Sequence, residues 1–129
     1  MTTVWVNGCF DILHRGHIEL FKHAKSLGDY LVVGVDTDER VRDSKGLSRP
    51  INNLQDRVEI LEAIKYIDEA VSFSADHELE KEILQSGASI MVVGSDYRDK
   101  RVIGSHLVNE VVFFERIGSY STTNIVGNS

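Results

Sequence analysis

Two histidines three positions apart carry the most chemical information in this sequence. His14 and His17 stand in residues 7–17, between a β-type run at 3–6 and an amphipathic helical run at 18–27. A strand that leads into a helix N-terminus presents main-chain N–H groups and the positive end of the helix dipole. The imidazoles add hydrogen-bond donors at the same place. The pattern therefore predicts an anion site of the kind that holds phosphate.

The residues around the histidines favour a phosphate site over a zinc site or a nucleophilic cysteine. Gly8 lets the main chain approach a ligand closely, and Gly16 removes a side chain where the helix begins. A histidine pair at this spacing also occurs as two metal ligands, but Cys9 is the only cysteine, which leaves a closed zinc site poorly supported. No base is evident for Cys9 as a nucleophile, so a small residue in a phosphate-binding turn is the favoured interpretation.

Five segments occur in an order that resembles the signatures of the HxGH nucleotidyltransferase family. They are GCFDILHRGH at 8–17, KGLSRPIN at 45–52, QDR at 55–57, VGSDY at 93–97 and STTNI at 121–125. The resemblance runs from about residue 3 to residue 126. Within the family, the sequence is most similar to the adenylyltransferase domain of the bacterial ADP-heptose synthesis enzyme and to glycerol-3-phosphate cytidylyltransferase.

The resemblance implies a role for each matching residue. His14 and His17 would contact the triphosphate, Lys45 would reach its phosphates from a loop, and Arg57 would grip the acceptor phosphate. Asp11 would help to hold Mg²⁺ or would orient the turn, and both roles stay open. The residues that the resemblance assigns to nucleotide binding are Gly8, Cys9, Phe10, Asp11, Gly16, Gly94, Asp96, Arg116, Ser121, Thr122 and Thr123.

The reaction that this family implies agrees with the residues present. A phosphate oxygen of an acceptor attacks the α-phosphorus of a nucleoside triphosphate and expels pyrophosphate. The nucleophile is already an anion, so the protein must supply in-line positioning and positive charge rather than a base. Mg²⁺ is expected as the cofactor, held mainly by the triphosphate, because few carboxylates lie near the turn.

The substrate follows from finer differences within the family. The cytidylyltransferases carry RTEGI before STT, whereas this sequence has RIGSY at 116–120, and its segment 45–50 looks more like the heptose-phosphate enzyme. Transfer from ATP to heptose 1-phosphate is therefore the leading prediction, and CTP-dependent transfer to glycerol 3-phosphate is the alternative. A non-catalytic nucleotide-binding regulator is a remoter alternative, because both histidines, Lys45 and Arg57 are present.

The composition bounds the class of protein. The 129 residues predict one domain over 1–129, and the net charge of −6 argues against a nucleic-acid partner. A single cysteine excludes an internal disulfide and predicts a cytoplasmic protein, and no run is apolar enough to predict a membrane segment. The resemblance and the small size together predict a homodimer.

The elements that must position these residues alternate along the chain. Strand patterns occur at 3–7, 31–35, 69–73, 89–93 and 111–114, and helical patterns at 18–27, 37–43, 54–66, 78–84 and from about 122. This order predicts an α/β fold, a Rossmann-like, doubly wound, five-stranded parallel sheet with the ligand at the carboxyl ends of its strands. The segment 44–53 has no hydrophobic period and is expected to form a mobile flap over the phosphates.

Overall fold

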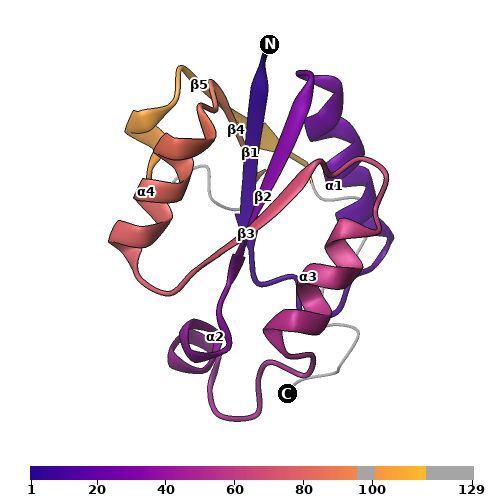
Figure 1. Ribbon diagram of the computed structural model, residues 1–129, viewed down its shortest axis with the longest axis vertical. Coiled ribbons are helices and arrows are strands. Elements are labelled where there is room, and N and C mark those ends of the chain that lie inside the picture. The colour runs from indigo at the N-terminus through magenta and orange to yellow at the C-terminus, as the bar shows by residue number, and fades with distance from the viewer. Residues whose placement is uncertain (96–100, 116–129) are drawn as a thin grey trace.

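A five-stranded sheet forms the centre of the protein, seen in a computed structural model that describes residues 1–95 and 101–115 (Figure 1). The strands are β1 (Thr3–Gly8), β2 (Tyr30–Asp36), β3 (Glu69–Phe73), β4 (Ile90–Gly94) and β5 (Glu110–Phe114). Their order is β3-β2-β1-β4-β5, and every neighbouring pair is parallel. The order reverses between β1 and β4, which is the switch point where such sheets bind ligands. The predicted doubly wound parallel sheet is confirmed.

Four helices connect the strands. They are α1 (Arg15–Ser26), α2 (Asp38–Lys45), α3 (Leu54–Glu62) and α4 (Asp76–Ser86), followed by a short 3₁₀ turn, η2, at Ser105–Leu107. In Figure 1, α1 and α3 cover one face of the sheet, α4 covers the other, and α2 lies beyond the carboxyl end of β2. Side-chain caps fix two of the helix starts, because Thr37 accepts a bond from the N–H of Arg40 and Asn53 from that of Asp56.

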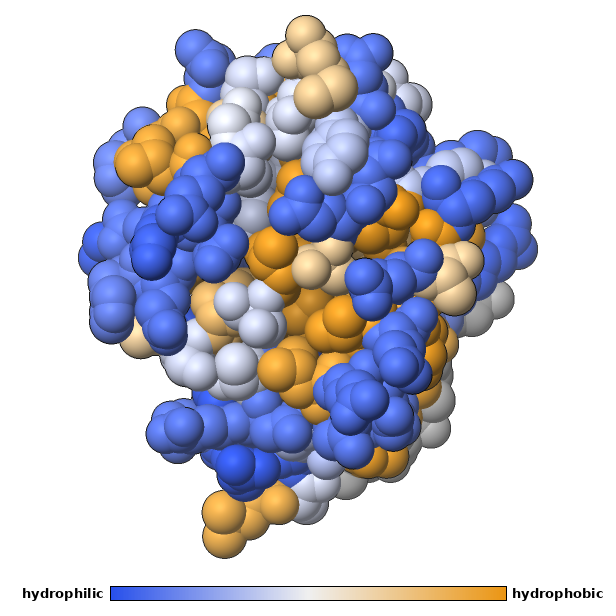
Figure 2. Space-filling model, viewed as in Figure 1, coloured by the Kyte–Doolittle hydropathy of each residue, from blue (hydrophilic) through white to orange (hydrophobic). Residues whose placement is uncertain are grey.

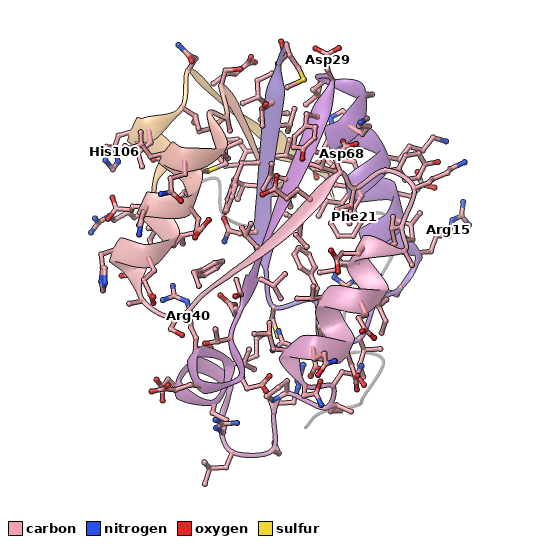
Figure 3. All side chains as sticks on the ribbon, in the orientation of Figure 1. Arg15, Phe21, Asp29, Arg40, Asp68 and His106 are labelled. Atoms are coloured by element: carbon pink, nitrogen blue, oxygen red, sulfur yellow. The ribbon has the colours of Figure 1, made fainter. Side chains whose placement is uncertain are left out.

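Alternation along the strands divides the core into two layers. On the α1 and α3 face, Val4 and Val6 pack with Phe21 of α1 and Leu61 of α3. On the α4 face, Trp5 packs with other residues of its layer, namely Val32, Phe73, Leu79, Ile83, Ala88 and Met91. Figure 3 shows Phe21 pointing from α1 toward the sheet while Arg15, on the same helix, points to solvent. Both faces of the central strands are therefore covered, as a parallel sheet requires.

One glycine is dictated by the packing of the central strands. The indole of Trp5 lies over Gly34, and a Cβ built on Gly34 would be 2.5 Å from Cζ2 of that ring. The β1–β2 register pairs Trp5 with Val32 and Asn7 with Gly34. The glycine thus makes room for the only tryptophan in the sequence.

The helix boundaries differ from the predicted ones by a few residues. α1 begins three residues before the predicted start, because His14 caps it, and α3 ends at Glu62 rather than at residue 66. The chain after α3 turns so that Ile64 and Ile67 join the core. α4 is longer than predicted, and Gly87, with φ of 70°, ends it in the left-handed conformation. The predicted C-terminal helix lies outside the described residues.

The surface is mainly polar. Figure 2 shows apolar side chains along the sheet edge between α4 and α3, bordered by the charged residues of both helices. Among the described residues, no helix is both long enough and apolar enough to cross a membrane.

Candidate active site

The turn between β1 and α1 is held by the two histidines. Nδ1 of His14 accepts a hydrogen bond from the main-chain N–H of Gly16 at 3.1 Å, which caps α1. Nδ1 of His17 in turn accepts a bond from the main-chain N–H of His14 at 3.2 Å. These reciprocal bonds are a capping box in which both side chains are imidazoles. A strand-to-helix junction was predicted here, but the cap and the start of α1 at Arg15 were not.

The same bonds determine how the imidazoles are presented. Because each Nδ1 accepts a main-chain N–H, the neutral form of each ring carries its hydrogen on Nε2. The two rings stack with their centroids 3.9 Å apart and their planes 30° apart. Two Nε2–H donors are therefore fixed side by side at the positive end of α1, an arrangement that matches a phosphate group.

Phe10 forms the support beneath the imidazoles. Its ring is buried, and it meets His17 edge-on at 5.6 Å and Phe21 at 5.3 Å between ring centroids. Its φ of 50° lies in the left-handed region, which is uncommon for an aromatic residue. A Cβ on Gly8 would lie only 3.0 Å from Cζ of this ring. Gly8 therefore leaves room for the Phe10 ring, which a larger residue would crowd.

Asp11 binds the loop that precedes α3. Its carboxylate accepts bonds from the main-chain N–H groups of Ile51 and Asn52, and from Nε of Arg49 at 2.9 Å. Asp11 and Arg49 are both buried, and the Asn52 amide donates back to the main-chain oxygen of Asp11 at 2.7 Å. Burial alone would raise the pKa of Asp11, but the three donors outweigh it and hold the pKa below the usual value.

These contacts bear on the two roles left open for Asp11. Both carboxylate oxygens already receive hydrogen bonds from the loop, so the geometry favours loop orientation over metal binding. No group of three or more His, Cys, Asp or Glu side chains within the described ranges could hold a metal ion. The chain's described residues thus do not fit a resident Mg²⁺ site.

Arg57 is buried rather than presented to an acceptor. Its guanidinium donates to the main-chain oxygens of Cys9 (2.8 Å), Asp36 (2.7 Å) and Asn52 (3.0 Å) and forms an ion pair with Asp38 at 2.6 Å. Its side chain is 0% exposed. The guanidinium therefore joins the turn between β1 and α1, the end of β2 and the loop before α3. These bonds use four of the five N–H groups of the guanidinium, so the geometry favours a positioning role over the predicted grip on an acceptor phosphate.

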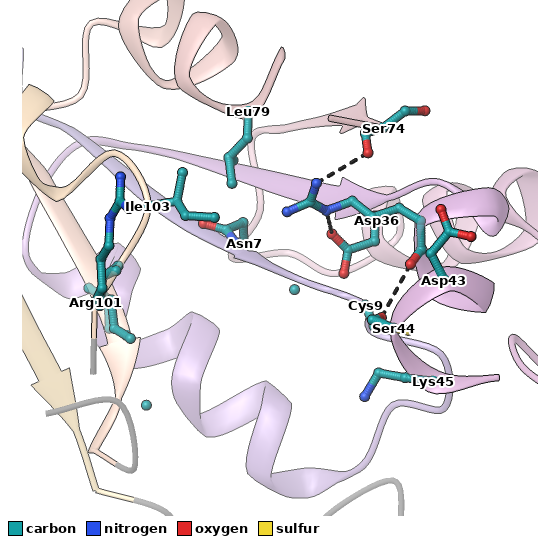
Figure 4. Close-up of a pocket in the computed structure, with 16 residues that line it drawn as sticks. Asn7, Cys9, Asp36, Asp43, Ser44, Lys45, Ser74, Leu79, Arg101 and Ile103 are labelled. Atoms are coloured by element: carbon teal, nitrogen blue, oxygen red, sulfur yellow. Dashed lines mark hydrogen bonds and ion pairs between the residues drawn. The ribbon is translucent and has the colours of Figure 1, made fainter. Parts of the chain in front are cut away.

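A pocket of about 650 Å³ opens beside the turn, on the α4 side of the strand ends (Figure 4). Gly8, Cys9, Lys45 and Gly94 line it, so the structure brings these four predicted residues together. Burial raises the pKa of the Cys9 thiol, although Arg57 and Lys45 oppose the shift. A protonated thiol is a poor nucleophile, which agrees with a structural role for Cys9.

The charges around this pocket differ from those of the whole chain. Its lining includes three cations and two carboxylates, Arg40, Lys45, Arg101, Asp36 and Asp43. In Figure 4, Lys45 lies beside Cys9, at the end of the pocket toward the histidine turn, and Arg101 lies at the opposite end. A positively biased pocket in a chain of net charge −6 suits phosphorylated ligands.

The remaining predicted residues divide into two groups. Gly16 supplies the N–H that His14 accepts, so it belongs to the turn. Asp96, Arg116, Ser121, Thr122 and Thr123 lie outside the described residues. The sequence did not single out Asp36, Arg40 or Asn52, because their importance arises from tertiary contacts. Arg49 falls within the segment KGLSRPIN at 45–52, but its burial against Asp11 had no signal in the sequence.

The comparisons with known proteins agree with this fold. The family model described as cytidylyltransferase-like matches residues 5–126, and the chain belongs to that family. The nucleotidyltransferase family predicted from the sequence is thereby confirmed.

Particular relatives refine the comparison. The chain is 44% identical over 125 residues to "Bifunctional protein HldE" of Campylobacter fetus subsp. fetus. The matched region covers 97% of this chain and 27% of that protein. It is 42% identical over 123 residues to the protein of the same name from Helicobacter hepaticus, covering 95% and 25%. The chain thus spans about a quarter of the length of these relatives.

Two solved structures share the fold. The lipopolysaccharide core biosynthesis protein of Thermoplasma volcanium GSS1 has a TM-score of 0.70 and 29% identity, with coverage of 94% of this chain and 99% of that chain. A protein of unknown function from Archaeoglobus fulgidus has a TM-score of 0.65, 19% identity and 90% coverage of each chain, and it supports the fold alone.

Proposed function

We propose that this domain transfers a nucleotidyl group from a nucleoside triphosphate to a small sugar or polyol phosphate and releases pyrophosphate. One observation carries the proposal: the stacked imidazoles of His14 and His17 lie at the start of α1, at the end of the same turn whose first residue, Cys9, lines a pocket at the carboxyl ends of β1 and β4. The turn suits a triphosphate and the pocket suits a second, smaller phosphorylated molecule. The cytidylyltransferase-like family supports the same reaction.

The proposed chemistry needs positioning and charge rather than a general base. The acceptor's phosphate oxygen attacks the α-phosphorus, the bond to the β-phosphate oxygen breaks, and pyrophosphate leaves. The Nε2–H groups of His14 and His17 and the ammonium of Lys45 would stabilise the negative charge that develops on the phosphate oxygens. Asp11 and Arg57 would act as positioning residues, since their contacts hold the turn and the loop before α3.

We propose that Mg²⁺ arrives with the triphosphate rather than occupying a site of its own. Mg²⁺ usually keeps several waters and binds substrate phosphates. The metal, when bound, supplies charge neutralisation on the phosphates. The saturated carboxylate of Asp11 and the lack of a metal-binding cluster within residues 1–95 and 101–115 are the observations behind this proposal.

ATP with heptose 1-phosphate is the leading substrate pair. Its support is the 42–44% identity to the bifunctional HldE proteins, together with the resemblance of segment 45–50 to the heptose-phosphate enzyme. The name of the Thermoplasma protein, lipopolysaccharide core biosynthesis, also favours a sugar acceptor. CTP with glycerol 3-phosphate is the second candidate, favoured by the cytidylyltransferase-like description of the family.

Pyrophosphate release from a matrix of substrates tests the proposal. ATP and CTP are each offered with heptose 1-phosphate, glycerol 3-phosphate and related phosphates, with Mg²⁺ present. We expect the highest kcat/KM for ATP with heptose 1-phosphate. The absence of release with every pair would contradict enzymatic function and favour a nucleotide-binding regulator. We further propose a cytoplasmic homodimer, whose mass light scattering would report directly.

A further inference from the structure

We propose that Asp36 is a specificity-determining residue of the acceptor site. Its carboxylate would accept hydrogen bonds from the hydroxyl groups of a neutral sugar or polyol phosphate and would reject an acceptor that carries its own carboxylate there. The inference rests on the proposed function, because it assigns the pocket on the α4 side of the sheet to the acceptor. None of the predicted site residues has this role.

The position of Asp36 is the first observation. It is the last residue of β2 and lines the pocket together with Asn7 and Gly8 of the neighbouring strand. Figure 4 shows it in the middle of the pocket, between Asn7 on one side and Cys9 on the other. Its side chain is 20% exposed, and that exposure is toward the pocket it lines. A ligand in the pocket would therefore meet this carboxylate.

Arg40 fixes the carboxylate without saturating it. Nε of Arg40 binds Oδ1 of Asp36 at 3.2 Å, while its other nitrogens bind the main-chain oxygen of Ser74 at 3.1 Å and Oδ1 of Asp76 at 2.9 Å. The guanidinium also lies 5.2 Å from the centroid of the Phe73 ring. Arg40 is thus held on several sides. Among the described residues, Oδ2 of Asp36 receives no hydrogen bond and remains available to a ligand donor.

Asn7 complements this acceptor with a donor. Nε1 of Trp5 donates to Oδ1 of Asn7 at 2.8 Å, which assigns the orientation of the amide. The amide NH₂ is then the donor that Asn7 can offer to a ligand. A hydroxyl group both donates and accepts, so a polyhydroxylated molecule satisfies Asp36 and Asn7 together, whereas a carboxylate offers Asp36 no hydrogen atom.

The electrostatics of the pocket point the same way. Burial raises the pKa of Asp36, opposed by Arg40, Arg57 and Lys45, so its charge is only partly compensated. In the part of the lining that the structure describes, Asp43 of α2 is the other carboxylate, and Lys45 and Arg101 are the cations besides Arg40. Lys45 lies near Cys9 in Figure 4, where the proposed function would place the reacting phosphate, which leaves Asp36 for the sugar hydroxyls.

The variant D36N tests the assignment. Steady-state kinetics are measured with a sugar 1-phosphate that the wild type uses and with the corresponding uronic acid 1-phosphate, in which a carboxylate replaces the terminal CH₂OH. Loss of a charge-assisted hydrogen bond should raise the KM for the neutral acceptor roughly 10-fold and leave the KM for ATP unchanged. The ratio of kcat/KM for the neutral over the acidic acceptor should fall on the order of 100-fold, because the repulsion is also removed.

Controls separate this role from a structural one. E39Q neutralises an exposed carboxylate of α2 outside the pocket and should change neither constant. D36S removes the same charge with a smaller side chain. It covers the case in which the amide of D36N disturbs Arg40, and it should show the same loss of discrimination. A ratio within twofold of wild type in folded D36N and D36S would overturn the assignment. A wild type that uses neither a sugar phosphate nor a polyol phosphate would instead overturn the proposed function, and the specificity role would fall with it.

Discussion

Replacing Arg57 with lysine distinguishes a positioning residue from a residue that grips the acceptor. The side chain is 0% exposed and makes four contacts, to three main-chain oxygens and to Asp38. Lysine keeps the charge, but its single ammonium cannot reach acceptors that a planar guanidinium contacts from three nitrogens. We therefore expect R57K to disturb the turn and the loop at the same time.

The contacts set the size of the effect. At least two of the four acceptors lose their donor in R57K, and a buried acceptor left unpaired costs about 1–3 kcal/mol. The free energy of unfolding should fall by about 2–4 kcal/mol, a large share of a total of about 5–15 kcal/mol. For a domain of this size, that loss corresponds to a fall in Tm on the order of 10 °C.

Thermal unfolding and steady-state kinetics, measured below the Tm of the variant, decide between the roles. Because the Cys9 carbonyl belongs to the phosphate turn, kcat should fall and the KM values for both substrates should change little. The matched control is R42K, a change at an exposed position of α2 that does not line the pocket. A wild-type Tm in R57K together with a raised KM for the acceptor alone would refute this reasoning and restore the acceptor-gripping role.

Four further perturbations follow from the site. G8A should push the Phe10 ring away from His17, since its Cβ would lie 3.0 Å from that ring, and should lower both Tm and kcat, by about 1–3 kcal/mol in stability; unchanged kcat would separate Phe10 from catalysis. H14A or H17A should lower kcat by about 10²–10³, as loss of one preorganised donor does, and near-normal turnover would sink their proposed role. K45A should weaken nucleotide binding and slow turnover together. In the wild type, limited proteolysis near Lys45 should slow when triphosphate is added, and cleavage at the same rate with and without triphosphate would mean that the loop does not close. The pKa of Asp11 is lowered in the folded state, so the unfolded chain binds the proton of this carboxyl more tightly. The stability that Asp11 contributes is therefore present above about pH 3.9 and lost below it. D11N should be less stable than wild type at neutral pH, and its free energy of unfolding should fall less steeply as the pH is lowered, as measured in denaturant titrations.

The sequence predicted the fold well because the pattern was strong at the level of whole elements. Continuous apolar runs and the strand–helix alternation determined the parallel sheet, and the five strand ranges agree with those of the structure to within about two residues at each end. The ends of α1 and α3 were less predictable. The start of α1 depends on an imidazole cap, and the end of α3 depends on the packing of Ile64 and Ile67.

The site was predictable where its residues are close together in the sequence, and not where they are brought together only by the fold. His14 and Gly16 lie within one turn of helix, so their spacing alone indicated the phosphate turn. Arg57 contacts Cys9 and Asp36, which are 48 and 21 residues away in the chain, and no local pattern reports such contacts. For the same reason, the burial of Arg57 had no signal in the sequence, although the importance of the segment was recognised.

The expected flap at 44–53 has two different halves. Arg49 is buried against Asp11, and the main chain of Ile51 and Asn52 is bound to the same carboxylate, so this half is tethered to the phosphate turn. Lys45 and Leu47 are exposed, and within residues 1–95 and 101–115 neither is bound to this carboxylate. Any closing movement is thus confined to the first half of the segment, at the end of α2. The second half holds the turn between β1 and α1 in a fixed position relative to α3. A ligand that draws Lys45 inward would therefore close the pocket without moving the histidines, which keeps phosphate positioning and loop closure mechanically separate.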